Sequence, residues 1–142
     1  MKLEIENNQL ANCITILHKI KLGGMPSIYK TRLIKKLNEF LTRAAEEQEE
    51  IQKEYYEVGE DGKPILEDDK CKDLEEYRKT MREFVTEKAV IDDGDSQVML
   101  RSVKKSLEKS EVEWEPEEAF LFEYLYSALE EAQDDTEDAK EV

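Results

Sequence analysis

Apolar residues recur at intervals of three and four along most of the chain, which is the spacing of one face of a helix. Five such stripes are present, so the sequence predicts a mainly α fold, a small domain of five helices around one core. The stripe residues that we expect to be buried are Leu10, Ile14, Leu17, Leu33, Leu37, Phe40, Leu74, Tyr77, Met81, Phe84, Leu100, Val103, Leu107, Phe120, Leu121, Tyr124 and Leu125.

Two short segments depart from this helical spacing. In residues 2–6, Leu3 and Ile5 alternate with charged residues, which is the period of a strand with one buried face. Residues 89–92 include a β-branched pair, which is typical of a second strand. We therefore expect a minor two-stranded β pairing between these segments, with Leu3, Ile5 and Ile91 facing the core.

The second helix is predicted to be the longest, from about Ile28 to Glu57, because neither Gly nor Pro interrupts it. At 1.5 Å per residue it would span roughly 45 Å, which exceeds the width of a compact domain of this size. Part of it should therefore project or pair. Its apolar seam is close to the heptad spacing of a coiled coil and runs through Leu33, Leu37, Phe40, Ala44, Gln48, Ile51 and Tyr55.

Capping residues predict where the helices begin and end. Asn7 and Asn8 favour the start of the first helix, and Gly23-Gly24 favours its end. Ser27 is the predicted cap of the second helix. Pro116 suits the first turn of the fifth helix, where its missing N–H has no cost.

The connector after the long helix and the end of the chain are both polar. Asp61-Gly62 is a turn signal, so residues 55–57 and 64–66 are predicted to form a small hairpin. A third helix should start near Asp73. Residues 133–142 are acidic and almost without apolar side chains, so we expect a single helical domain over 1–132 followed by a disordered acidic tail.

Composition narrows the function classes. The chain has 142 residues, of which 36 are acidic and 21 basic, and its formal net charge of −15 argues against direct binding to nucleic acid or to an anionic membrane. No stretch approaches the ~18 apolar residues that a membrane span requires. The first residues contain no apolar signal segment. Cys13 and Cys71 have no metal-like spacing, so we expect a cytosolic protein with reduced thiols, Cys13 lying in the core.

The charge is unevenly distributed along the chain. Residues 1–38 contain seven bases and two acids, a net charge of +5, so the remaining residues carry −20 to give the total of −15. The long helix contains the divide, with bases in its first turns and acids in its later turns. This order opposes the helix dipole, which favours acids first and bases last.

An antiparallel neighbour would compensate this arrangement. It could be the acidic fifth helix of the same chain, a second copy in a two-fold dimer, or an external anionic ligand. The partner would accordingly be another protein or a second copy of this chain. The candidate interaction residues along the helix are Lys30, Arg32, Lys35, Lys36, Glu46, Glu47, Glu50 and Glu54.

Candidate catalytic chemistry is sparse. Asp92, Asp93 and Asp95 surround Gly94 and could hold a hard cation, but the spacing is not that of an EF-hand, and the same residues are typical of a turn that caps a helix. His18 is the only histidine and has no second ligand or nucleophile at a suitable spacing. We therefore expect no enzyme, with no catalytic, cofactor-binding or metal-binding residue. A metal-dependent enzyme built on the aspartate turn stays an open alternative.

Three segments carry a family resemblance: residues 1–12 (MKLEIENNQLAN), 30–39 (KTRLIKKLNE) and 90–95 (VIDDGD). Together they resemble a family of short phage and prophage proteins of Gram-positive bacteria, known only as a domain of unknown function. The resemblance covers roughly residues 1–130. It implies a phage-encoded protein made in the host cytoplasm from a gene among the late genes, and it brings no catalytic residues.

Two functions fit these observations best. The first is a non-enzymatic protein–protein interaction module that acts with other late phage proteins through the long helix. The second is a counter-defence inhibitor that uses acidic surface to block a host nucleic-acid-binding protein. The charge of −20 over residues 39–142 is compatible with either function.

Overall fold

The computed structural model describes the backbone of residues 2–141 and the side chains of residues 2–132. Within this part of the chain, the fold is mainly helical, with five α-helices, three short 3-10 turns and one two-stranded antiparallel sheet, which confirms the predicted fold class. The elements in order are β1 (Leu3–Glu6), α1 (Leu10–Lys19), α2 (Gly24–Tyr55), α3 (Leu74–Thr86), β2 (Lys88–Ile91), α4 (Gln97–Glu108) and α5 (Pro116–Glu141).

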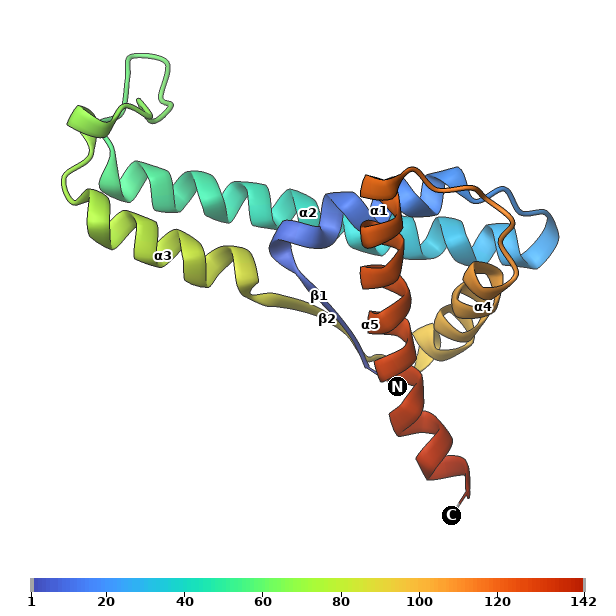
Figure 1. Ribbon diagram of the computed structural model, residues 1–142. Helices are drawn as coiled ribbons and strands as arrows, with labels where there is room; N and C mark the ends of the chain where they lie inside the picture. Colours follow the sequence, from blue (N-terminus) through green and yellow to red (C-terminus); the bar gives the residue numbers. More distant parts are fainter. Residues whose placement is uncertain (1, 142) are drawn as a thin grey trace.

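The molecule has two parts that share the long helix α2 (Figure 1). The head contains β1, α1, residues 24–40 of α2, β2, α4 and α5. The arm contains residues 41–87, which comprise the rest of α2, the connector and α3. Figure 1 shows the arm extending away from the head, with the connector at its far end.

The head holds the hydrophobic core. Its helices and its two strands contribute side chains to a single buried cluster. The buried members are Leu3, Ile5, Leu10, Cys13, Ile14, Ile16, Leu17, Ile20, Leu33, Ile34, Leu37, Ala89, Ile91, Met99, Leu100, Val103, Leu107, Leu125, Leu129 and Ala132.

The predicted strand pairing is confirmed. Leu3 lies opposite Ile91 and Ile5 opposite Ala89, and these four side chains are buried. Val90, which lies between the buried residues of β2, is exposed, as the alternation of a strand requires.

One predicted core residue is wrong. Phe120 is 73% exposed, whereas Leu125, Leu129 and Ala132 on the same helix are buried. Phe120 is nine residues from Leu129, which is two and a half helical turns and places it on the opposite face of α5. The predicted members that are only partly buried are Phe40, Leu74, Tyr77, Met81, Leu121 and Tyr124.

The arm is held together by far fewer buried groups. The second half of α2 packs against α3, so the long helix both projects and pairs, as its length predicts. Within the arm, Ala44, Tyr56 and Phe84 are buried. Tyr77 of α3 makes edge contacts with Tyr55 at 5.8 Å and with Tyr56 at 5.0 Å between ring centroids.

The capping predictions were partly correct. Asp73 caps α3 by accepting a hydrogen bond from the Glu76 N–H at 3.1 Å. Asn7 does not cap α1; its side-chain amide donates to the Phe84 carbonyl oxygen at 3.0 Å and joins the end of β1 to α3. The predicted start of α2 is also wrong.

Helix α1 ends at Lys19, and the Gly23-Gly24 pair begins α2 instead of ending α1, with Gly23 as the N-cap and Gly24 as the first residue. Gly24 has a φ of 63°, in the left-handed region that favours glycine. Pro26 is tolerated because it lies in the first turn of α2, where backbone N–H groups have no partner within the helix.

The connector forms the predicted hairpin only as isolated bridges. Val58 pairs with Pro64, and the Gly59 N–H donates to the Lys63 carbonyl oxygen at 2.8 Å. Gly62 has a φ of 79°, as the turn signal predicts. A second bridge between Tyr56 and Cys71 fastens the connector to the end of α2. The predicted disordered tail at 133–142 lies outside the residues whose side chains are described, and it stays a prediction.

Candidate functional site

The bases at the start of α2 make contacts inside the head. The Lys30 ammonium donates to the Ile20 carbonyl oxygen at 2.6 Å, and so satisfies the carbonyl group of the residue just after α1. The Arg32 guanidinium lies 5.5 Å from the centre of the Tyr29 ring, a cation–π contact. The Lys30 contact thus stabilises the α1–α2 corner, and the Arg32–Tyr29 contact lies within α2.

Lys36 extends the same pattern to the start of α4. Its ammonium lies 3.9 Å from a carboxylate oxygen of Asp93. The fifth helix was one predicted intramolecular neighbour of this basic end. Among the described residues, however, the ion pair of Lys36 is with the turn before α4. Lys35 is exposed.

All acids of α2 except Glu39 lie in the arm, and Glu83 of α3 and Glu87 just after α3 lie beside them. A groove of about 420 Å³ runs between the two helices. Its lining residues include five glutamates and no basic residue, and they are Glu47, Glu50, Ile51, Glu54, Thr80, Glu83, Phe84 and Glu87. We call this surface the acidic groove. Glu46 is exposed on α2 outside this lining.

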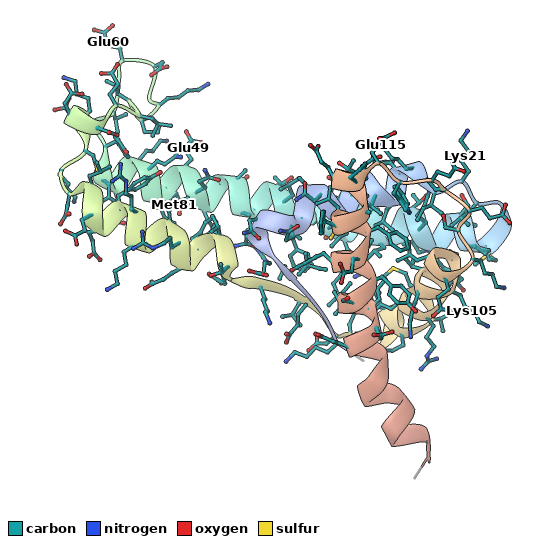
Figure 2. The ribbon with its side chains drawn as sticks, in the orientation of Figure 1. Lys21, Glu49, Glu60, Met81, Lys105 and Glu115 are labelled. Atoms are coloured by element: carbon teal, nitrogen blue, oxygen red, sulfur yellow. The ribbon has the colours of Figure 1, made fainter. Side chains whose placement is uncertain are left out.

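Little of this negative charge is paired. Glu47 pairs with Arg43 at 3.6 Å within α2. Among the described residues, the other four glutamates of the acidic groove form no ion pair. Figure 2 shows Glu49 and Glu60 on the arm, and Lys21, Lys105 and Glu115 in the head.

The predicted interaction residues therefore form two separate groups. Lys30 and Glu54 are 24 residues apart on one helix, which corresponds to about 36 Å. The basic group lies in the head and the acidic group lies in the arm. Sequence reasoning did not include Glu83 and Glu87, because nothing in the sequence gives the register of α3 against α2.

The aspartate turn at 92–95 is organised as a helix start. Asp93 accepts a hydrogen bond from the Ser96 hydroxyl at 2.8 Å, and its backbone oxygen accepts from the Ser96 N–H at 3.1 Å. The Ser96 hydrogen bond is the main cause that lowers the pKa of the Asp93 carboxyl. Among the described residues, no three His, Cys, Asp or Glu side chains are grouped so that they could hold a metal ion.

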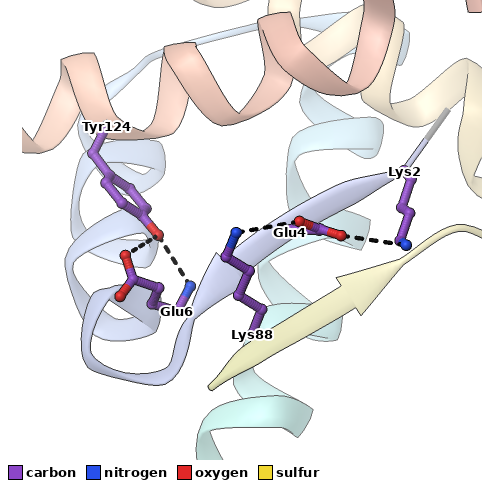
Figure 3. Close-up of polar contacts among 5 residues, drawn as sticks. All are labelled: Lys2, Glu4, Glu6, Lys88 and Tyr124. Carbon is purple, nitrogen blue, oxygen red and sulfur yellow. Dashed lines mark hydrogen bonds and ion pairs between the residues drawn. The ribbon is translucent and has the colours of Figure 1, made fainter. Parts of the chain in front are cut away.

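A polar contact that the sequence did not predict fastens α5 to β1 (Figure 3). The Tyr124 hydroxyl accepts a hydrogen bond from the Glu6 N–H at 3.0 Å. Burial raises the pKa of this hydroxyl. On the same strand, Glu4 lies between Lys2 at 3.3 Å and Lys88 at 3.4 Å, and hydrogen bonds from these two lysines lower the pKa of its carboxyl. The Tyr124 contact thus joins α5 to β1, whereas the Glu4 pairs join β1 to β2 and to Lys2.

The histidine and the cysteines do not form a reactive centre. His18 is exposed in the last turn of α1. Both cysteines are free thiols, Cys13 in the head and Cys71 in the arm. Burial raises the pKa of the Cys13 thiol to about 12, which suppresses its thiolate at neutral pH.

A second pocket, of about 1060 Å³, lies in the head between the α1–α2 corner and α4. We call it the basic pocket, because six basic residues line it: Lys19, Lys21, Arg101, Lys104, Lys105 and Lys109. Sequence reasoning missed it because the two contributing segments are about eighty residues apart. The segment from α4 also lies in the part of the chain that is acidic on average.

Comparison with known proteins gives no match. No protein family model, no curated protein and no solved structure is similar to this chain. Within the described residues, no helix combines the length and the apolar character that crossing a membrane requires.

Proposed function

We propose that this protein is a non-enzymatic protein–protein interaction module whose arm binds a basic surface of another protein. One observation carries the proposal: five glutamates, from α2, from α3 and from the residue that follows α3, line one groove, and no basic residue lies among them. Mutual repulsion of these carboxylates destabilises the isolated arm, and a cationic partner would relieve it.

The acidic groove also offers apolar contact. Ile51 and Phe84 lie among its lining residues. Buried apolar contacts supply much of the affinity of an interface, while charge complementarity increases the association rate and selects the partner. A basic segment with an apolar residue, such as the exposed face of a lysine-rich helix, would match both features.

The resemblance to phage proteins supplies a biological setting for this proposal. In that setting the chain is phage-encoded, acts in the host cytoplasm and binds another late phage protein. The net charge of −15 supports a protein partner over direct binding to nucleic acid or to an anionic membrane.

Charge reversal in the acidic groove tests the proposal. The probe is a library of randomised synthetic peptides presented to the immobilised protein. We expect enrichment of basic peptides containing apolar residues, and we expect it to disappear in the double variant Glu50→Lys, Glu54→Lys. Salt should weaken the same binding because the pairs are exposed.

The matched control is the double variant Glu60→Lys, Glu113→Lys, which changes the net charge equally at exposed sites outside the acidic groove. It should keep the enrichment of basic peptides. If the wild-type protein enriches no basic peptides, or if the groove variant enriches them as well as the control does, the proposal fails.

The alternative is a counter-defence inhibitor whose acidic surface occupies the nucleic-acid-binding groove of a host protein. The two rows of carboxylates along the arm favour it, since such a mimic needs acids arrayed on one face. Capture of a host nuclease that duplex DNA displaces would favour this alternative. Capture of a phage structural protein that DNA does not displace would favour the interaction module.

A further inference from the structure

We infer that the basic pocket of the head is a second binding site, which takes an acidic peptide segment of a partner protein with an apolar side chain among its carboxylates. This site differs from the acidic groove in charge, in location and in the elements that form it. It therefore does not depend on the function proposed for the arm.

The basic pocket lies where several elements end. The end of α1, the α1–α2 connection and the first turn of α2 form one side, and α4 and the residues after it form the other. Apolar residues from both sides contribute to its lining, among them Ile20, Leu22, Pro26 and Val112. Val98 also lines it and is 55% exposed. Glu108 and Glu111 also line it, so its six bases exceed its acids by four, and the pocket combines an apolar wall with a net positive lining.

Most of the positive charge in the basic pocket is unpaired. Lys19 pairs with Glu118, and Lys104 pairs with Glu108 at 3.8 Å. The other four bases of the lining form no ion pair with a described residue: Lys21, Arg101, Lys105 and Lys109. In a protein of net charge −15, four unpaired bases around one pocket mark a local site for an anionic group.

Arg101 provides an independent indication of a ligand. Its Nε atom is buried and has no hydrogen-bond partner, and it is the only such side-chain atom in the part of the chain whose side chains are described. A buried donor without an acceptor is costly. The dipoles at the ends of α1 and α4 account for nearby lysines, but they supply no acceptor for this group. A carboxylate of a bound peptide would supply one if the partly exposed Arg101 side chain turned toward the pocket that it lines.

The size and lining of the pocket favour a peptide over other anions. A small inorganic anion would leave the apolar wall exposed to water, whereas alternate side chains of an extended peptide can contact the wall and the bases separately. Nucleic acid would extend past the pocket over a protein whose overall charge repels it. The arm of a second copy is a pair of helices and is broader than an extended segment.

The same peptide library, presented to the intact protein, tests this inference. We expect a second enriched class, consisting of acidic peptides that contain an apolar residue. A peptide of this class, resynthesised with fluorescein, should bind roughly tenfold more weakly to the double variant Lys105→Glu, Lys109→Glu, because two exposed attractive pairs become repulsive. Fluorescence anisotropy measures the affinity.

Two further variants provide matched controls. The pair Lys63→Glu, Lys79→Glu changes the net charge equally at exposed positions outside the basic pocket and should leave the affinity unchanged. Arg101→Met keeps the length of this partly exposed side chain and removes its donors, the buried Nε among them. It should weaken the binding of the acidic peptide, and circular dichroism should report unchanged helix content.

Four outcomes would overturn the inference: no acidic class in the library, equal weakening by the two charge-reversal pairs, full competition by inorganic phosphate, or self-association that Lys105→Glu, Lys109→Glu abolishes. The arm variant Glu50→Lys, Glu54→Lys separates this inference from the proposed function. It should lose the enrichment of basic peptides and keep the enrichment of acidic peptides, so the two proposals can fail independently of each other.

Discussion

The head and the arm share helix α2 but differ in how they are stabilised. In the head, apolar side chains from strands and helices far apart in the sequence form one buried cluster. In the arm, two neighbouring helices pack along one seam, with Ala44, Tyr56 and Phe84 as its buried apolar residues. Regions with few buried contacts open at lower free energy than the core. The arm should therefore open at lower free energy than the head, and the repulsion among its carboxylates adds to this difference.

The largest expected difference between the two parts is in thiol reactivity, because each part carries one cysteine. Cys13 in the head is 1% exposed with its pKa raised to about 12, and Cys71 in the arm is partly exposed. At about pH 8, iodoacetamide should modify Cys71 at least about a thousandfold faster, because Cys13 needs both exposure and ionisation to react. Mass spectrometry of tryptic peptides measures both rates.

Unfolding in urea supplies the control for this measurement, since both thiols should then react at similar rates. Similar rates in the native protein would mean that the head opens as readily as the arm, and the contrast between the two parts would be lost.

The second prediction concerns the global stability of the head. Leu100 is fully buried in α4, so Leu100→Ala should lower the free energy of unfolding by about 2–5 kcal/mol. Equilibrium urea denaturation followed by circular dichroism measures the change. Leu66→Ala in the connector, where the side chain is 57% exposed, should change the same quantity by less than about 0.5 kcal/mol.

A local effect is expected in the arm. Tyr77→Ala removes two aromatic edge contacts, each worth about 0.5–1.5 kcal/mol, and should destabilise the arm by about 1–3 kcal/mol. Hydrogen exchange should increase in α3 and in residues 41–55, while the head keeps its protection. Phe120→Ala, which truncates an exposed aromatic residue of the head, should change neither part. Equal loss of protection throughout the molecule would show that the two parts unfold as one.

The smallest expected effect is an increase in stability. Arg101→Met removes a buried donor that has no acceptor, so it should raise the free energy of unfolding by up to about 1 kcal/mol. Arg82→Met on the exposed side of α3 should be neutral. Thermal denaturation measures both variants. A lower stability for Arg101→Met would indicate that the guanidinium is satisfied in the free protein and would remove one argument for the basic pocket.

Local patterns in the sequence predicted the elements well. The alternation around Leu3 and Ile5 was enough to place β1, and Asp73 was enough to begin α3, because strand periodicity and helix capping depend on neighbouring residues. The prediction that Phe120 is buried was wrong because a helical stripe can be broader than the face that the tertiary structure covers. Only packing decides which side of α5 is buried.

The surfaces were less predictable because they depend on which segments meet. The acidic groove needs the register of Glu83 and Glu87 against α2, which no local pattern contains. Lys30 illustrates the converse. Its charge suggested a binding residue, whereas its ammonium satisfies the carbonyl oxygen of Ile20. A charged residue at a helix corner can be part of the architecture, and its position in the sequence alone does not distinguish the two roles.

Helix α2 also sets the distance between the two proposed binding sites. Pro26, in its first turn, lines the basic pocket, and Glu54, in its last turn, lines the acidic groove. The 28 residues between them correspond to about 40 Å of continuous helix. An acidic segment and a basic segment bound at the two ends would therefore be kept at a set separation, whatever their own flexibility. If both segments belong to one assembly, the distance between them should match the length of α2. Inserting one helical turn into α2 would then weaken the simultaneous binding of the two segments.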